Sequence, residues 1–467
     1  MKIGYITRIA IIASLGGFLF GYDTAVISGT IGFVSSQFIL DTVLEGWYVS
    51  SALVGTIVGV LVAGVLSDKF GRKEILILSA VFFGFSALGC MLSGSFYQLV
   101  VYRLVGGIGV GIASMLSPLY ISEMAPASKR GRLVALYQFA ITVGILFAYF
   151  FNAYLLKLSQ STVFAGSTGL MDQVMFTEVW RAMLGSETLP ALIFLILLFT
   201  VPKSPRWLVM KGEKEKARKV LLKSVGPGEA EREIKGIETN LVKESGGLKM
   251  AFSGGFKVAM IMGIALAFLT QVSGINAIIY YGPKILEEAG LQVSEALGGH
   301  VIIGMVNVLF TLVAIWKIDS LGRKTLLLAG VTGIIISLII IGVLFYFEIS
   351  NTFLLMTFIL VFIACFAFSY GPVIWVLLSE IYPLPTRGIA MSIATMALWI
   401  GTAFVGQMTP WFLENLRPHG TFWFFALCTF PTVYIALKVM PETKGKTLEE
   451  IENYWLTKNS RYESIGK

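Results

Sequence analysis

Long apolar runs alternate with short polar connections along almost the whole chain. There are about twelve such runs, each close to the ~20 residues that an α-helix needs to cross ~30 Å of hydrocarbon. They cover residues 9–31, 47–67, 74–95, 99–122, 132–155, 179–201, 254–283, 298–318, 325–347, 353–380, 388–412 and 421–440. This pattern predicts an all-α membrane protein with twelve transmembrane helices.

A charged hexapeptide occurs twice between these runs. Asp68 to Lys73 reads DKFGRK, and Asp319 to Lys324, 251 residues later, reads DSLGRK. Two further pairs follow in the same order, at offsets of 257 and 239 residues: Glu123 with Arg130 and Glu380 with Arg387, then Pro202 to Arg206 and Pro441 to Lys446. Repeats of this length are domains, as in transporters that arose by duplication. We therefore expect two pseudo-symmetric six-helix bundles.

One polar insert separates the two halves. Between Lys203 and Lys249 the chain carries 12 Lys or Arg and 7 Asp or Glu. Alternating charges at 213–219 predict short solvated helices, interrupted at 226–228 by Gly, Pro and Gly. The expected domains are residues 1–202 for the N-terminal bundle, 203–249 for the linker helices, 250–440 for the C-terminal bundle and 441–467 for a cytoplasmic tail.

Charge placement predicts the orientation of the spans. The chain is 56% apolar and 14% charged, and its net charge of +8 could by itself suggest a nucleic-acid partner. The Lys and Arg residues, however, line the short connections after even-numbered spans, and residues 32–46 contain neither. The positive-inside rule then places both termini in the cytoplasm, and no nucleic-acid partner is expected. The run after Arg8 is long and contains Asp23, which favours an uncleaved first span over a signal peptide.

Ionisable residues within the spans are the first candidates for function. Asp23 lies well inside the first span, where an ionised carboxylate is costly and is usually functional. Arg103 in the fourth span is its possible partner, and Glu187 in the sixth is a second carboxylate that could join them. A moving cation could switch Asp23 between proton uptake and release. The alternative is a static buried ion pair that sets helix register.

The repeated motifs supply a second candidate group, at the cytoplasmic ends of the spans. We expect a charge network that holds the halves together in one state and is broken in the other. Its members are Asp68, Arg72, Glu123, Arg130, Asp319, Arg323, Glu380 and Arg387. The alternative is that these charges only set topology, although topology would not require the carboxylates.

Polar and aromatic side chains at membrane depth form the third group. They are Gln138, Gln271, Asn276, Tyr280, Asn307, Trp375 and Trp399. Amides offer donors and acceptors that suit a neutral polyol, and indole faces suit the C–H faces of a sugar ring. Gly274 would permit a broken helix that turns Gln271 and Asn276 toward one cavity. Singly, each could instead make an interhelical hydrogen bond.

The composition gives little basis for metal or hydrolytic chemistry. Cys90, Cys365 and Cys428 lie in apolar runs without paired spacing, and His300 and His419 are the two histidines. These residues predict neither a disulfide framework nor a metal site. No nucleophile with a base partner is visible, so we expect no cofactor and no enzymatic activity.

Together these motifs resemble the sugar porter family of the major facilitator superfamily, over essentially the whole chain. The resemblance rests on the paired D-x-x-G-R-K motifs, Trp180-Arg181, Pro202 to Arg206, Gln271 to Asn276, Gly371 to Trp375 and Pro441 to Gly445. Residues 20–29 and 371–380 look most like the bacterial D-xylose/proton symporters. The resemblance implies proton coupling at Asp23 with Arg103 and Glu187 beside it, since uniporters of the family typically carry Asn there. It also implies a sugar site formed by the seven polar and aromatic residues, with Phe20 and Gly371 lining it.

Four positions depart from the family pattern. Lys203 replaces the Glu that is usual in the P-E-S-P-R motif, which weakens the expected network at that corner. Ile145, Thr270 and Leu398 stand where the xylose symporters carry Gln. A site that loses amide partners is expected to lose affinity or to favour another sugar.

The sequence thus predicts a proton-coupled monosaccharide importer that works by alternating access, with D-xylose or a related pentose as substrate. The alternatives are a hexose or inositol porter, a sugar uniporter and, more remotely, a membrane sugar sensor that does not transport. Its expected partners are the sugar, protons and membrane lipid. We expect a multi-pass protein of the inner (plasma) membrane that functions as a monomer.

Overall fold

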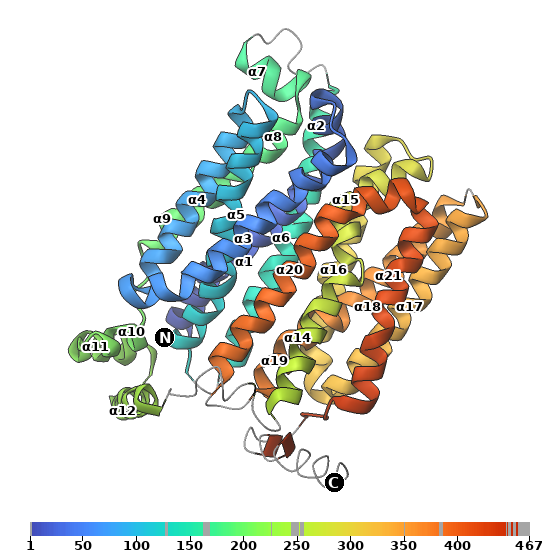
Figure 1. Cartoon of the computed structure of the whole chain (residues 1–467). Coiled ribbons are helices and arrows are strands. Elements are labelled where there is room, and N and C mark those ends of the chain that lie inside the picture. The colour runs from blue at the N-terminus through green and yellow to red at the C-terminus, as the bar shows by residue number, and fades with distance from the viewer. Residues whose placement is uncertain are drawn as a thin grey trace. The chain divides into compact units, whose positions relative to one another are not determined.

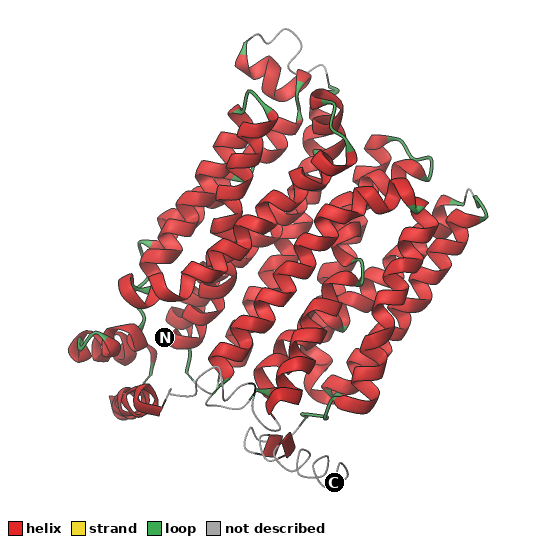
Figure 2. Ribbon diagram, in the orientation of Figure 1, coloured by secondary structure: helices red, strands yellow, loops and turns green. Residues whose placement is uncertain are grey.

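The computed structural model describes residues 2–126, 129–161, 169–225, 227–243, 252, 256–349, 351–382, 386–444, 446, 450–451 and 454–455. Within these residues the regular secondary structure is helical (Figure 2). The all-α prediction is therefore confirmed for the part of the chain that the structure describes.

Helices of the first half are α1 (Lys2–Val26), α2 (Ile31–Phe38), α3 (Thr42–Phe70), α4 (Arg72–Leu92), α5 (Phe96–Met124), α6 (Arg130–Ser159), α7 (Leu170–Asp172), α8 (Trp180–Gly185), α9 (Thr188–Leu198), α10 (Pro205–Met210), α11 (Lys214–Ser224) and α12 (Pro227–Lys243). Helices of the second half are α14 (Phe256–Val272), α15 (Ile275–Glu288), α16 (Val293–Leu321), α17 (Arg323–Tyr346), α18 (Thr352–Phe368), α19 (Tyr370–Ile381), α20 (Arg387–Asn415) and α21 (Arg417–Tyr434).

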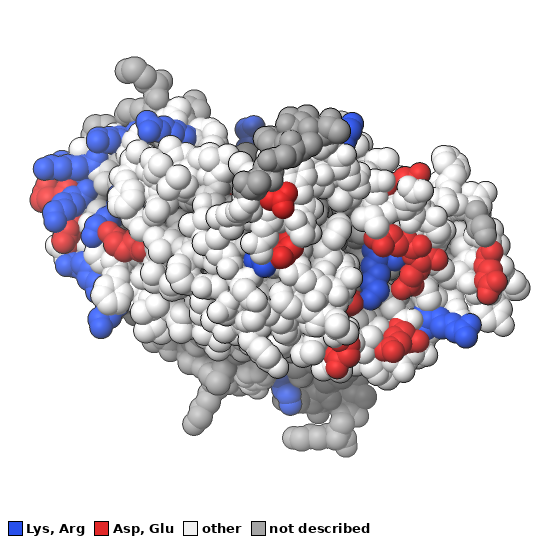
Figure 3. Space-filling view, turned by 90° about the horizontal axis from the view of Figure 1, so that it is seen from above, with Lys and Arg blue, Asp and Glu red and all other residues white. Residues whose placement is uncertain are grey.

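Twelve helical spans among the described residues are long and apolar enough to cross a membrane, as the sequence predicts. The helices extend beyond the apolar runs; the second span, for example, covers Thr42–Phe70 rather than 47–67. The polar residues that flank each apolar run are also helical, since a helix satisfies its backbone hydrogen bonds whatever the side chains are. In the view from above, uncharged residues cover most of the visible surface, and charged residues form small separate groups (Figure 3).

The chain forms two compact units. One contains Met1–Val242 and Ile279–Met305, and the other contains Lys243–Ile278 and Val306–Lys467. The segment Ile279–Met305 therefore groups with the first half of the chain, although the sequence repeat assigns it to the second. The division into bundles 1–202 and 250–440 stays a prediction.

Close backbone contact holds the first unit together. Helix α3 packs along α5, and α1 packs along α6 (Figure 1). A Cβ atom added to Gly107 would lie 1.9 Å from the carbonyl oxygen of Ala52, and one added to Gly111 would lie 2.2 Å from that of Thr56. Gly107 and Gly111 therefore form a small-residue face on α5, because only glycine permits this approach.

Three of the spans that the structure describes are interrupted by a turn, and each interruption has a local cause. Gly274 separates α14 from α15 with a φ of +89°, as the sequence predicts, because glycine adopts positive φ at little cost. The breaks at Ser186–Glu187 and at Ser369 are not anticipated from the apolar pattern. Pro190 and Pro372 follow them, and a proline cannot donate the hydrogen bond to the carbonyl four residues earlier.

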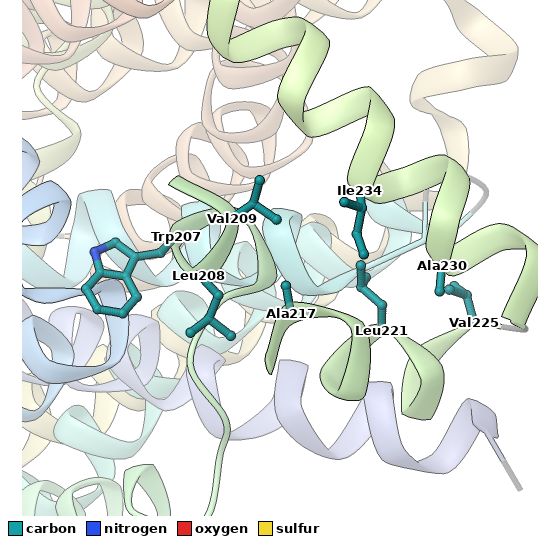
Figure 4. Close-up of a cluster of buried hydrophobic side chains, with 8 residues drawn as sticks. All are labelled: Trp207, Leu208, Val209, Ala217, Leu221, Val225, Ala230 and Ile234. Carbon is teal, nitrogen blue, oxygen red and sulfur yellow. The ribbon is translucent and has the colours of Figure 1, made fainter. Parts of the chain in front are cut away.

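The linker helices α10, α11 and α12 have a hydrophobic core of their own. Trp207, Leu208, Val209, Ala217, Leu221, Val225, Ala230 and Ile234 are buried together (Figure 4). Ion pairs on the surface join Lys214 to Glu238 at 2.5 Å and Arg218 to Glu231 at 2.6 Å. Two helices are found where the alternating charges predict them. Helix α12 begins at Pro227 rather than after the 226–228 break, because proline suits the first turn of a helix.

Candidate functional site

A buried ion pair joins the first and fourth spans of the first unit. Asp23 lies near the C-terminal end of α1, and Arg103 lies in the second turn of α5; each is 3% exposed. The Arg103 Nη1 donates to Asp23 Oδ1 at 2.7 Å. The sequence-based pairing of these two residues is thus present in the structure. Because both groups are buried, losing either partner would leave an uncompensated charge, which is costly.

Glu187 completes this group from the break between α8 and α9. It is 3% exposed, its carboxyl group interacts with that of Asp23, and its Oε1 has no hydrogen-bond partner within the described residues. The break lies within the sixth span, Trp180–Leu198, so Glu187 is located inside a membrane span. Two carboxyl groups and one guanidinium group therefore share one buried site.

Tyr280 of α15 extends the group. It is 2% exposed and lines a cavity of about 10 Å³ together with Asp23, Thr24 and Arg103. Such a volume is at the lower limit for one water molecule. The Tyr280 hydroxyl has no hydrogen-bond partner in the part of the chain that the structure describes. A residue that the sequence assigns to sugar binding therefore adjoins the proposed proton site.

An amide cluster surrounds the helix break in the second unit. Asn276 Nδ2 donates to Gln271 Oε1 at 2.6 Å, and the Thr402 hydroxyl lies 3.1 Å from the same oxygen. Gln271 and Asn276 are 8% and 6% exposed. Both of these hydrogen bonds use Gln271 Oε1. The break at Gly274 thus brings the two predicted amides together.

The other sugar-site candidates are distributed over both units. Phe20, Gln138 and Tyr280 belong to the first unit, and Asn307, Gly371, Trp375 and Trp399 belong to the second. Trp399 is buried on α20, three residues before Thr402, whereas Trp375 and Gly371 on α19 are half-buried. Gln138 on α6 and Asn307 on α16 are also half-buried.

Of the charges in the repeated motifs, Asp68, Arg72 and Glu123 of the first unit form a connected network. Arg72 binds Asp68 at 2.8 Å and Glu123 at 3.2 Å, and Glu123 also accepts from the Ser204 hydroxyl. Arg130 donates to the backbone carbonyl of Ser122 at 3.1 Å rather than to a carboxylate.

Lys203, which replaces the usual Glu, pairs with Glu74 at 3.0 Å. Lys203 therefore binds Glu74, which is not a member of the Arg72–Glu123 network. Its side chain is 45% exposed, so the pair adds little stability.

The second unit repeats the arrangement. Arg323 binds Glu380 through two contacts of 2.8 and 3.2 Å, and the Thr443 hydroxyl donates to Glu380 at 2.6 Å. Glu442 accepts from the backbone N–H groups of Arg323 and Lys324 at the start of α17. The side chains of Asp319 and Arg387 lie outside the described residues. Each network lies within one unit, so its role in holding the halves together stays a prediction.

Several functional candidates are not identified by the sequence reasoning. Thr402, Ser204 and Thr443 each bind a predicted site residue through a hydroxyl group. Ser204 and Thr443 occupy matching positions in the third repeated motif, so the repeat itself carries the signal. Thr402 follows Trp399 by three residues and so lies on the same face of α20.

Twelve spans, two compact units and matching arginine–glutamate networks define a membrane transporter with an internal repeat. A sequence profile described as "Sugar (and other) transporter" matches residues 9–455. The chain belongs to this family, the sugar porters of the major facilitator superfamily. This assignment to transporters agrees with the expectation that the protein is not an enzyme.

Relatives and solved structures agree over nearly the full length. The chain is 40% identical to the arabinose-proton symporter of Bacillus subtilis and 38% identical to the D-xylose-proton symporter of Escherichia coli, in both cases over 97% of this chain and 96% of the relative. The inward-open structure of the xylose transporter XylE from E. coli matches with a TM-score of 0.82 at 37% identity, covering 97% of this chain and 100% of that one. The predicted major facilitator fold is thereby confirmed.

Proposed function

We propose that the protein is a proton-coupled monosaccharide importer that works by alternating access. The observation that carries this proposal is the buried Asp23–Arg103 ion pair with Glu187 beside it. A carboxylate inside a span is expensive to keep ionised, and a uniporter would have no need of one. Bacterial relatives described as arabinose-, D-xylose- and galactose-proton symporters support the same assignment.

Proton coupling follows from the chemistry of the three groups. Deprotonated Asp23 binds Arg103, whereas protonated Asp23 is neutral and holds the guanidinium group only weakly. Arg103 can then turn to Glu187, which faces the same site. Protonation thus changes the contacts between α1, α5 and the α8–α9 break, and so biases the equilibrium between transport states. The three residues are proposed as the proton-coupling group.

The proposed substrate is D-xylose or a related pentose. Gln271, Asn276, Tyr280, Asn307, Gln138, Trp375, Trp399, Phe20 and Gly371 are proposed as the sugar-binding residues. Gln271 Nε2 offers a donor for a sugar hydroxyl, and the half-buried Trp375 offers an apolar face. The arabinose- and D-xylose-proton symporters, at 40% and 38% identity, support the choice of a pentose. A hexose or inositol porter or a uniporter is the alternative. A membrane sugar sensor that does not transport is a more remote alternative.

Thr270 and Leu398 bear on which sugar is bound. Thr270 donates its hydroxyl to the Leu266 carbonyl of its own helix at 2.7 Å, so it does not replace the amide that xylose symporters carry there. Leu398 is 7% exposed and apolar. Fewer polar partners are therefore available than in those symporters, which would favour a sugar with fewer or differently placed hydroxyl contacts.

The proposed setting is the bacterial plasma membrane, with both termini in the cytoplasm and a monomer as the functional form. Orientation rests on the Lys and Arg residues in the connections after even-numbered spans.

A panel assay with purified protein in proteoliposomes tests the proposal. Uptake of labelled D-xylose, L-arabinose, D-glucose, D-galactose and myo-inositol would be measured with and without an inwardly directed proton gradient. We expect accumulation of a pentose above equilibrium only when the gradient is present. Equilibration at equal rates in both conditions would indicate a uniporter, and a hexose optimum would overturn the choice of pentose.

A further inference from the structure

The segment Ile279–Met305 docks on the first unit although it follows the second unit's first helix in the chain. It contains the later part of α15 and the beginning of α16. Tyr149 of α6 donates to the Ile279 carbonyl at 3.2 Å, and its ring lies 4.3 Å from the ring of His300, centre to centre. His300 is fully buried, and the absence of a side chain on Gly282 makes room for it. The docking surface is therefore closely packed.

An ion pair between Lys284 and Glu45 also joins this segment to the first half of the chain. Lys284 Nζ lies 2.6 Å from Glu45 Oε1, and the Ser35 hydroxyl donates to Glu45 Oε2 at 2.9 Å. Glu45 is 6% exposed. It lies in the first turn of α3, where the helix dipole favours a negative charge. Both carboxylate oxygens are thus occupied, one by α2 and one by the docked segment.

We propose that Glu45 and Lys284 are a positioning pair for transport, forming a latch that holds the outer part of α15 against α3. The proposal rests on the transport function above, since the 32–46 and 289–292 connections are then extracellular. Separating α15 from α3 would leave a carboxylate buried without its cation, and such a loss is costly. The pair therefore favours the docked arrangement, and its release accompanies opening of the outer side.

Although Lys284 is partly exposed, its removal should weaken the latch because it leaves the buried Glu45 carboxylate without a cation. Its side chain is 37% exposed, so the ammonium group alone could remain hydrated after separation. The Glu45 side chain is 8% exposed and has less access to water. Removing Lys284 should consequently disturb docking more than replacing Glu45 by the isosteric Gln, which keeps its hydrogen bond to Ser35.

Distance measurements between spin labels test the latch without any substrate. Labels at Val43 on α3 and Glu287 on α15, both exposed, would be placed in a chain whose Cys90, Cys365 and Cys428 are replaced by Ser. Lys284→Met should move the ratio of docked to separated distances by about tenfold or more toward separation, and Glu45→Gln should move it in the same direction by less. The charge exchange Glu45→Lys with Lys284→Glu should restore most of the docked population.

Lys157→Met is the matched control. Lys157 is an exposed lysine in the last turn of α6 without an ion pair among the described residues, so its removal should leave the distances unchanged. Unchanged distances in Lys284→Met, or a charge exchange that separates the labels further than either single change, would overturn the proposal. These outcomes do not depend on the sugar or on protons, so they are separate from a failure of the proposed transport function.

Discussion

Arg103 Nη1 lies 2.7 Å from Asp23 Oδ1, and both residues are 3% exposed. The pair joins α1 to α5, two helices that also pack against each other along the first unit. Its strength depends on the protonation of Asp23, because a neutral carboxyl group loses the charge-assisted contact. A proton can therefore act directly on the packing of two spans, and Glu187 offers Arg103 a second carboxylate.

The two arginine–glutamate networks should bias the equilibrium between transport states. Arg72→Ala removes the cation from Glu123, and Arg323→Ala removes it from Glu380. We expect each change to shift the resting population toward the inward-open state by ~0.5 to 3 kcal/mol, depending on burial. Distances between labels on the ends of the spans that carry these networks would measure the shift.

Arg132→Ala controls for loss of positive charge alone. Arg132 is exposed in the first turn of α6, next to the repeated-motif residue Arg130. Equal distances in wild type, Arg72→Ala and Arg323→Ala would mean that these arginines serve only topology.

Sugar affinity should depend on the amide cluster and on Trp375. Gln271→Ala removes a hydrogen-bonding group from a buried site, which typically costs ~1 to 3 kcal/mol, or roughly five- to 150-fold in affinity. Trp375→Ala should also weaken binding substantially, by removing an apolar face. Titration calorimetry on purified protein would measure both effects.

Thr402→Val provides a graded comparison, because it removes only the hydroxyl group beside Gln271. A smaller loss is expected there. If all three variants bind the sugar with wild-type affinity, the assigned residues do not form the substrate site.

Restoring amides should change sugar selection. Thr270→Gln together with Leu398→Gln adds two hydrogen-bonding groups at buried positions on α14 and α20. We expect tighter D-xylose binding or a different preferred sugar, measured with the same panel of sugars by calorimetry. The same sugar profile in the double variant and the wild type would exclude these positions from specificity.

Acid should weaken the hydrogen bonds around Glu178 in the first unit. Burial acts to raise the pKa of Glu178, but hydrogen bonds from Gln37, Gln173 and Arg181 outweigh it and hold that pKa below its ordinary value. The resulting stability is fully present above the ordinary pKa and is lost as pH falls through the lowered pKa. Glu178→Gln should therefore lower the melting temperature at neutral pH and flatten its decline in acid. Parallel melting curves at all pH values would contradict this.

Some of these structural features can be predicted from the sequence, and others cannot. The twelve spans and the break at Gly274 follow from local composition, because apolar run length and a glycine amid polar groups are visible residue by residue. The breaks at Ser186–Glu187 and Ser369 escape that reasoning, since the prolines responsible come three residues later. Docking of Ile279–Met305 on the first unit depends on tertiary contacts such as Lys284 with Glu45, which no repeat or spacing reveals.

The central claim is that Asp23 couples sugar movement to protons, and Asp23→Asn tests it most directly. Asparagine has the shape of the protonated carboxyl group but cannot titrate, so sugar binding and exchange of sugar across the membrane should persist. The measurement is accumulation of labelled pentose in proteoliposomes under a proton gradient, with exchange measured in the same preparation. We predict that the wild type concentrates the sugar and that Asp23→Asn only equilibrates it. Accumulation by Asp23→Asn to the wild-type level would contradict the account.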